Sequence, residues 1–142
     1  MLLKGYRDDA LNADAFDDEG RFRTGDIGFL RPDGYITLTG RLKDVIIRKG
    51  ENISAKEVED VLYAHPAVSD VAVIGLPDRE RGERACAVIV ADRELSPAEV
   101  AAFCEEHGLA RFKAPEQVVR IEALPRNSAG KVVKFELRQR FG

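Results

Sequence analysis

The sequence predicts an α+β fold, in which a small mixed sheet is flanked by helices and preceded by a β-hairpin. Two continuous apolar runs, 71–76 and 85–91, are typical of strands that are buried on both faces. Capping signals at Ser54 and Ser96 predict two helices, and apolar residues alternating around a Pro-Asp-Gly turn predict the hairpin. The compact part is therefore expected to contain, in order, a hairpin, a helix, two strands, a helix, a strand and a helix.

The composition is that of a globular chain with mixed charge. Its 142 residues, 44% of them hydrophobic, suffice for one packed domain. The 22 basic and 25 acidic residues give a net charge of -3, which argues against a basic surface for nucleic acid. No apolar run is long enough to span a bilayer, so we expect at most a peripheral contact with membranes.

The two cysteines, Cys86 and Cys104, have neither the spacing of a metal site nor the density of a disulfide framework. Neither has a plausible base nearby in the sequence, and free cysteine is among the residue types most often buried. We therefore expect both to be small apolar residues of the core. Reduced cysteines and the lack of a secretory segment favour a cytoplasmic protein.

The part of the chain before the first predicted helix is expected to be loop and hairpin. Residues 1–20 are polar, without a sustained period or a strong helix start, and are interpreted as loop and extended chain. Residues 27–39 form the first hairpin, and a polar connector, 40–44, separates it from a second hairpin, 45–53. Gly50 lies at the tip of the second hairpin, where its backbone freedom suits a tight turn.

Two helices are predicted from their capping signals. The hydroxyl of Ser54 is placed for the amide of Glu57, whose side chain can reach back to complete a capping box, and His65-Pro66 should end this helix. The segment Ser96-Pro97-Ala98-Glu99 repeats the signal with proline at the first helical position, and the second helix should end before Gly108. Each helix carries an apolar stripe for the core.

The remaining elements follow from turn residues and apolar positions. A charged turn, 78–83, separates the two buried strands, and a further strand is expected at 118–121. Residues 124–130 combine Pro, Asn, Ser and Gly and are expected to be a flexible loop. A short final helix is then expected, which the apolar residues Phe135, Leu137 and Phe141 fit.

Asp26 is the first candidate ligand-binding residue, because it lies between Gly25 and Gly28 just before a strand. A carboxylate there can accept both hydroxyls of a ribose, and the glycines let a ligand approach the backbone closely. The alternative is an ordinary turn, which a Gly-Asp pair before a hairpin more often marks.

The segment 40–53 holds two further candidates. Arg41 offers a planar donor fork that suits ribose or phosphate oxygens. Gly50 can present bare backbone to a narrow channel at the hairpin tip. The alternative is a solvated basic hairpin with a structural glycine.

Lys131 ends the segment Pro125-Arg126-Asn127-Ser128-Ala129-Gly130-Lys131. A lysine is a compact cation on a long stem, which can bridge a carboxylate and an α-phosphate as charge develops. The alternative is an exposed loop lysine. The phosphate-binding pattern G-x-x-x-x-G-K-[ST] is absent, since Val132 follows the lysine, so we reject a P-loop.

In this order and spacing, the three segments together resemble the adenylate-forming superfamily of acyl-CoA synthetases, luciferases and peptide-synthetase adenylation domains. The resemblance extends from Leu3-Lys4-Gly5-Tyr6 to Phe141, and 50–53 and 73–78 are most similar to acyl-CoA synthetases. It implies that the phosphate-binding loop, the adenine-binding segment and the acyl pocket lie in a large N-terminal domain. We therefore expect this chain to be a C-terminal fragment that is inactive alone.

The resemblance implies a two-step reaction in the intact enzyme. A carboxylic acid, expected to be a fatty acid, attacks ATP bound to Mg2+ to give acyl-adenylate and pyrophosphate, and the thiol of coenzyme A then displaces AMP. By motif position, Asp26 would bind the ribose hydroxyls, Arg41 would assist there, and Lys131 would be the catalytic cation that orients carboxylate and phosphate. No resident metal is expected.

The same resemblance divides the chain at Lys43, the hinge position. Residues 1–42 would end the N-terminal AMP-binding domain, and 43–142 would form a mobile C-terminal domain. Rotation about the hinge would replace Lys131 at the active site by the hairpin of Gly50, which would line the pantetheine tunnel.

Three positions differ from the pattern of the superfamily. Arg81 stands in the turn after the Pro-Asp pair, where several relatives carry tryptophan. Phe112 and Lys113 resemble a segment that contacts the CoA nucleotide, but Ala114 stands where that segment carries a further basic residue. Lys134 stands where arginine is common, and we expect this exchange to affect only surface pairing.

Two other functions stay open at this stage. In the first, the intact protein would transfer the acyl group to the phosphopantetheine arm of a carrier protein instead of to free CoA. In the second, the chain would be a non-catalytic interaction module. The acyl substrate is not encoded in these residues, because its pocket is expected in the missing domain, and the oligomeric state is not indicated.

Overall fold

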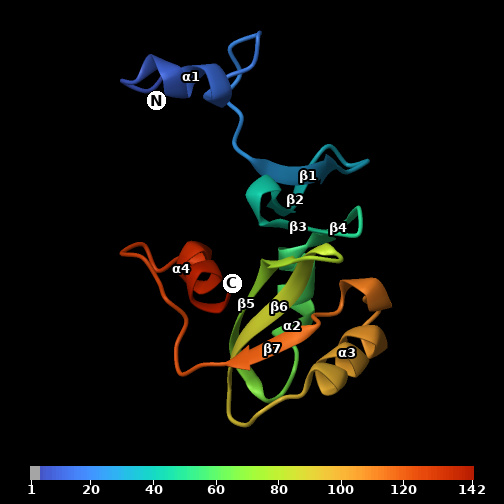
Figure 1. The fold of residues 1–142 in the computed structure, drawn as a ribbon. Coiled ribbons are helices and arrows are strands. Elements are labelled where there is room, and N and C mark those ends of the chain that lie inside the picture. The colour runs from blue at the N-terminus through green and yellow to red at the C-terminus, as the bar shows by residue number, and fades with distance from the viewer. Residues whose placement is uncertain (1–3) are drawn as a thin grey trace.

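The computed structural model describes residues 4–142. Residues 1–3, with which the expected first domain begins, lie outside the described residues, and so does Leu3 at the start of the resemblance. The α+β class is confirmed (Figure 1). The helices and strands are α1 (Asp9–Ala15), β1 (Asp26–Leu30), β2 (Ile36–Arg41), β3 (Val45–Arg48), β4 (Glu51–Ser54), α2 (Ala55–Leu62), β5 (Val68–Asp78), β6 (Gly82–Ala91), α3 (Pro97–Glu106), β7 (Gln117–Arg120) and α4 (Lys134–Phe141). Two short 3-10 helices, Leu42–Asp44 and Arg111–Lys113, complete the list.

A mixed sheet of five strands forms the centre of the domain. Its order is β4-β3-β6-β5, and β7 also pairs with β6. The long strands β5 and β6 are antiparallel, whereas β7 runs parallel to β6. Strand β3 meets β6 only at Arg48↔Gly82, so the second hairpin is attached to one end of β6. No helix within residues 4–142 is both long and apolar enough to cross a membrane.

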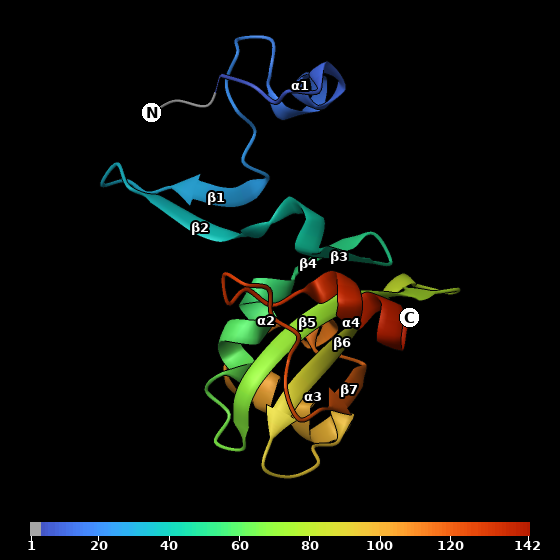
Figure 2. The same cartoon turned by 90° about the vertical axis from the view of Figure 1, so that its left-hand side faces the viewer.

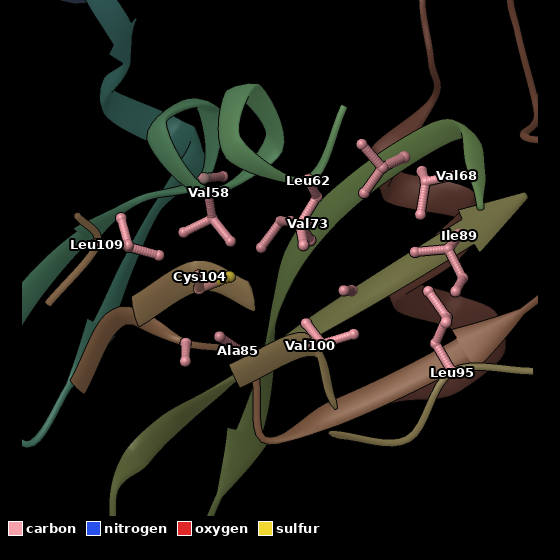
Figure 3. Close-up of a cluster of buried hydrophobic side chains, with 14 of the residues drawn as sticks. Val58, Leu62, Val68, Val73, Ala85, Ile89, Leu95, Val100, Cys104 and Leu109 are labelled. Atoms are coloured by element: carbon pink, nitrogen blue, oxygen red, sulfur yellow. The ribbon is translucent and has the colours of Figure 1, made fainter. Parts of the chain in front are cut away.

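Strands β5 and β6 are buried on both faces, as the two apolar runs predict. Val73 of β5 packs with α2 and α3 in one cluster, whereas its neighbour Ile74 packs with Leu137 of α4 in a second cluster on the other face. Figure 3 shows the first cluster, in which Val58 and Cys104 extend from the two helices toward the sheet. Successive side chains of a strand point to opposite faces, so a strand between two helical layers needs an unbroken apolar run.

The segment before β1 differs from the expectation of loop and extended chain, because it contains the helix α1. Asp8 caps this helix by accepting a hydrogen bond from the amide of Ala10 at 3.0 Å. The side chain of Asn12 accepts from the amide of Tyr6 at 2.6 Å and donates to its carbonyl at 3.1 Å. No residue of α1 is buried, so the helix has no apolar period by which the sequence could reveal it.

Both predicted hairpins are present. Strand β2 runs on to Arg41, inside the expected polar connector, and Leu42–Asp44 then forms a 3-10 helix. At the tip of the β3–β4 hairpin, Lys49 and Gly50 both have positive φ, 51° and 82°, as a two-residue hairpin turn requires. Figures 1 and 2 show α1 and the β1–β2 hairpin standing apart from the main sheet on the same side.

The first capping box is only half formed. Ser54 accepts from the amide of Glu57 at 3.4 Å, but the carboxylate of Glu57 turns away and lies 2.7 Å from the ammonium of Lys113. An ammonium is a stronger partner for a carboxylate than a neutral amide, which explains the difference. The second box, between Ser96 and Glu99, is complete.

The expected final helix is present as α4, and Leu137 is its fully buried residue, whereas Phe135 is 63% exposed. The surroundings of Lys134 differ from expectation. Lys134 does not make a surface pair: its ammonium lies 2.7 Å from Glu59 of α2, and both side chains are less than 20% exposed. Glu59 also accepts from the amide of Val73 at 2.8 Å, so this carboxylate joins α2, β5 and α4. Their packing on one another brings the two charges together, which sequence position alone does not reveal.

We predict that Glu59→Ala destabilises the domain by about 1–3 kcal/mol, because the change leaves the amide of Val73 and the ammonium of Lys134 without their partner. The neighbouring Asp60→Ala is the matched control, since it removes only an exposed pair with Lys56 and should change stability by less than about 0.5 kcal/mol. Urea unfolding of both variants measures the difference. Equal stabilities would contradict a structural role for Glu59.

We also predict that neither thiol reacts in the folded chain. Cys86 and Cys104 are both 0% exposed, and burial raises the pKa of each thiol to about 11, so the reactive thiolate is scarce at pH 8. A chromogenic disulfide reagent at pH 8 should label both cysteines in denaturant and neither in buffer. Rapid labelling of either one without denaturant would show that its side of the core opens easily.

Candidate functional site

Three of the six predicted site residues line one cleft of about 700 Å³: Asp26, Arg41 and Lys131. One wall is the start of β1 with the end of β2, another is one face of α2 along most of its length, and the third is the turn before α4. Figure 2 shows this turn rising beside α2, below the β1–β2 hairpin. The cleft therefore joins residues from both sides of the predicted boundary at Lys43.

Asp26 and Arg41 face each other because they are paired across the β1–β2 ladder. The guanidinium Nε of Arg41 lies 3.0 Å from Oδ1 of Asp26, with the two side chains 49% and 25% exposed. The contact uses one carboxylate oxygen, so the other can accept a hydroxyl group, and Arg41 keeps further donors for a second oxygen. Gly25, which precedes the pair, has a φ of 73° that favours glycine.

Lys131 is presented by a hydrogen-bonded turn within the expected loop. Arg126 and Val132 form a bridge, and the amide of Asn127 donates to the carbonyl of Lys131 at 2.9 Å. The side chain of Asn127 accepts from the amides of Ala129 and Lys131, at 3.0 and 2.9 Å. These hydrogen bonds from the backbone to the asparagine side chain close the turn, although only one pair of residues, Arg126 and Val132, forms a β-bridge. The backbone of Lys131 is thus fixed while its side chain stays exposed.

The cations of the cleft are paired with one exception. Within residues 4–142, four of its five cationic side chains form ion pairs: Arg41–Asp26, Lys56–Asp60, Arg126–Asp70 and Lys134–Glu59. Lys131 forms none in the same described part of the chain. A single unneutralised ammonium in the lining of a cleft attracts an anionic ligand.

The other three predicted residues lie outside this cleft. Lys43 lines a neighbouring hollow that also includes Arg41 and Lys131. Gly50 lies at its hairpin tip, where a side chain added to it would meet no atom within 4 Å. Phe112 lines a third hollow beside α3, where its carbonyl accepts from Arg48 at 3.4 Å. The structure therefore does not bring Gly50 or Phe112 to Lys131.

Three residues that the sequence did not identify support the turn. Arg126 lies 2.5 Å from Asp70 of β5, which accepts a hydrogen bond from the hydroxyl of Tyr63 at 2.6 Å. Arg126 lies in the same motif segment as Lys131, so its position in the sequence could have identified it as a candidate. Asp70 and Tyr63 carry no local signal, because they precede Arg126 by more than fifty residues. No group of three metal-ligating side chains gathers anywhere in residues 4–142.

Comparison with known proteins agrees with this geometry. The chain is 48% identical, over 99% of its length, to the long-chain-fatty-acid–CoA ligase FadD13 of Mycobacterium tuberculosis, of which it covers 28%. It is 46% identical, over 94% of its length, to the 2,3-dihydroxybenzoate-AMP ligase of Bacillus subtilis, of which it covers 25%. Its fold matches ATP-bound MatB of Rhodopseudomonas palustris with a TM-score of 0.88 at 39% identity, covering 97% of this chain and 28% of that one.

The resemblance to adenylate-forming ligases is thereby confirmed, and the chain spans about a quarter of the length of these relatives. Residues 57–131 match the family model of the AMP-binding enzyme C-terminal domain, a segment that runs from the first turn of α2 to Lys131 itself. Because this match covers more than half of the sequence, the chain belongs to the family of AMP-binding enzyme C-terminal domains.

Proposed function

We propose that this chain is the C-terminal part of an ATP-dependent acyl-CoA synthetase, which activates a fatty acid as acyl-adenylate and transfers it to CoA. The observation that carries the proposal is the unpaired Lys131, held on a closed turn in the same cleft as the Asp26–Arg41 pair. A ribose acceptor and a free cation in one cleft suit a nucleotide whose phosphate is under attack. The similarity to fatty-acid–CoA ligases supports this choice of acid and acceptor.

In the first step, the substrate carboxylate attacks the α-phosphorus of ATP, and pyrophosphate leaves with its Mg2+. Asp26 accepts the ribose hydroxyls, and Arg41 both orients Asp26 and donates to the sugar. The ammonium of Lys131 lies between the carboxylate and the α-phosphate and stabilises the charge that develops there. In the second step, the CoA thiol attacks the acyl carbon, and AMP leaves.

The two steps place different parts of this chain at the reacting atoms. Lys43 lies in the 3-10 helix that connects β2 to β3, which suits a hinge between 1–42 and 43–142. Rotation there carries Lys131 away and brings in the hairpin of Gly50. Phe112 then lies toward the CoA nucleotide, beside Arg48.

One alternative has specific support, because the chain is also similar to 2,3-dihydroxybenzoate-AMP ligases. In that case the acid is aromatic and the acceptor is the phosphopantetheine arm of a carrier protein. AMP release by the intact protein, measured with CoA and with a holo-carrier that bears a free phosphopantetheine thiol, distinguishes the two acceptors. A non-catalytic interaction module would release no AMP with either.

We predict that Lys131→Ala lowers the rate of adenylate formation by about 10²- to 10³-fold in the intact enzyme, because it removes a charge that stabilises the transition state. Thioester formation from supplied acyl-adenylate should be nearly unchanged. Pyrophosphate exchange and single-turnover thioester formation measure the two steps. Lys56→Ala is the control, since it removes a cleft cation already paired with Asp60 and should cost far less. Equal loss in both steps would make Lys131 structural.

For Gly50 we predict that the leucine variant slows thioester formation and spares adenylation, since its side chain would intrude into the channel of the thiol arm. Gly50 has a φ of 82°, so any side chain there strains the backbone. Gly50→Ala carries a similar strain with little bulk and is the matched control. Single-turnover rates that are equal for Gly50→Leu and Gly50→Ala would assign Gly50 to its turn alone.

A further inference from the structure

Arg126 ties the Lys131 turn to the main sheet through two separate groups. Its Nη1 donates to the carbonyl of Gly130 at 2.7 Å, and its Nη2 donates to Oδ2 of Asp70 at 2.5 Å. Gly130 directly precedes Lys131, so the first contact holds the peptide from which the lysine side chain starts. The second contact holds that peptide against β5. A planar guanidinium can serve both acceptors at once, whereas an ammonium cannot do so with the same geometry.

Asp70 is itself fixed on its other oxygen. Oδ1 accepts from the hydroxyl of Tyr63 at 2.6 Å and from the amide of Val71 at 3.0 Å. The register of β5 shifts between Val68 and Asp70, and such a bulge redirects the side chain at that point. The Asp70 side chain is 22% exposed, compared with 43% for Arg126. The anchor is therefore the more buried and more constrained member of the pair.

The protonation states keep this arrangement charged. Partial burial by itself raises the pKa of Asp70, but the hydrogen bonds from Tyr63 and Arg126 outweigh it and hold the pKa below its ordinary value. Burial, together with the bond to Asp70, raises the pKa of the Tyr63 hydroxyl, which therefore remains a donor. At neutral pH, Asp70 is a carboxylate with a donor on each oxygen.

We propose that Arg126, anchored by Asp70 and Tyr63, is a positioning residue that sets the place of Lys131 for adenylate formation. The proposal rests on the proposed function, and it adds residues that act on the reaction only through the lysine. Loss of the Asp70 contact frees the turn from β5, and loss of the Arg126 side chain also removes its bond to the carbonyl of Gly130, which braces the turn itself. A displacement of about 1 Å at a reacting group costs on the order of 10²-fold in rate.

The first test compares Arg126→Gln and Asp70→Asn in the intact enzyme. Both should lower kcat of pyrophosphate exchange by about 10- to 10²-fold, with little change in KM for ATP and in thioester formation from acyl-adenylate. Arg93→Gln is the matched control and should change neither step. Arg93, like Arg126, bridges one backbone carbonyl and one carboxylate, but it does so at the start of α3.

Asp70→Asn keeps the guanidinium of Arg126 but weakens its anchor, so an unchanged rate of exchange in this variant would overturn the proposal. A direct contact between Arg126 and the nucleotide would instead raise KM for ATP in Arg126→Gln, and that result would overturn the proposal as well. Equal loss in both half-reactions would overturn it as well. Should either variant fold poorly, Tyr63→Phe removes a single hydrogen bond from the anchor and should give a smaller loss of the same kind. Unchanged exchange in Tyr63→Phe would then count against the anchor.

A second readout does not depend on activity. In Arg126→Gln, hydrogen exchange at the amides of Ala129 and Lys131 should become faster, while the amides of β5 and β6 keep their protection. Unchanged exchange at both turn amides would show that Arg126 does not order the turn. If the turn responds but Lys131→Ala leaves adenylation intact, the proposed function fails and the ordering role of Arg126 stands as a structural fact alone.

Discussion

The burial of β5 and β6 on both faces is the constraint on which the other elements depend. Each fully buried Val, Ile or Leu side chain contributes about 1.5–3 kcal/mol relative to an exposed one, so the sheet requires a helical layer on each side. Helices α2 and α3 cover one face, and α4 covers the other. Because α4 must pack there, the turn that precedes it emerges beside α2. The position of Lys131 is thus a consequence of core packing.

Charge pairing then shapes what the cleft can bind. Its walls carry acidic as well as basic side chains, and the ion pairs neutralise every described cation except Lys131. A cleft crowded with free cations would bind many anions without discrimination, whereas one free ammonium beside a carboxylate would, under the proposed function, favour a ligand with both a sugar and a phosphate. The pairs with Asp70 and Glu59 also tie the turn and α4 to the sheet and to α2. The same ion pairs therefore serve selectivity and geometry.

The β1–β2 hairpin differs from the main sheet in that its apolar side chains are largely exposed. It forms a separate two-stranded sheet, and Leu30, Tyr35 and Ile36 are each about 70% exposed. An isolated hairpin is only marginally stable in water, and its apolar side chains gain nothing from exposure. The proposed division at Lys43 would produce this pattern, because it assigns the hairpin to the preceding domain. The Asp26–Arg41 pair would then meet Lys131 across the proposed domain boundary, as the proposed function requires.

Local patterns in the sequence determined the main elements and the motif residues. Apolar runs predicted β5 and β6, the Ser96–Glu99 box predicted α3, and the segment ending at Lys131 was recognised without a structure. These signals lie within a few residues of one another, where spacing translates directly into geometry. Tertiary structure decided the rest. Lys113 pairs with Glu57, which therefore does not complete its capping box, and Arg126 pairs with Asp70; each pair spans 56 residues of sequence. Distances between residues so far apart are set only by packing of the folded chain, and no local pattern encodes them.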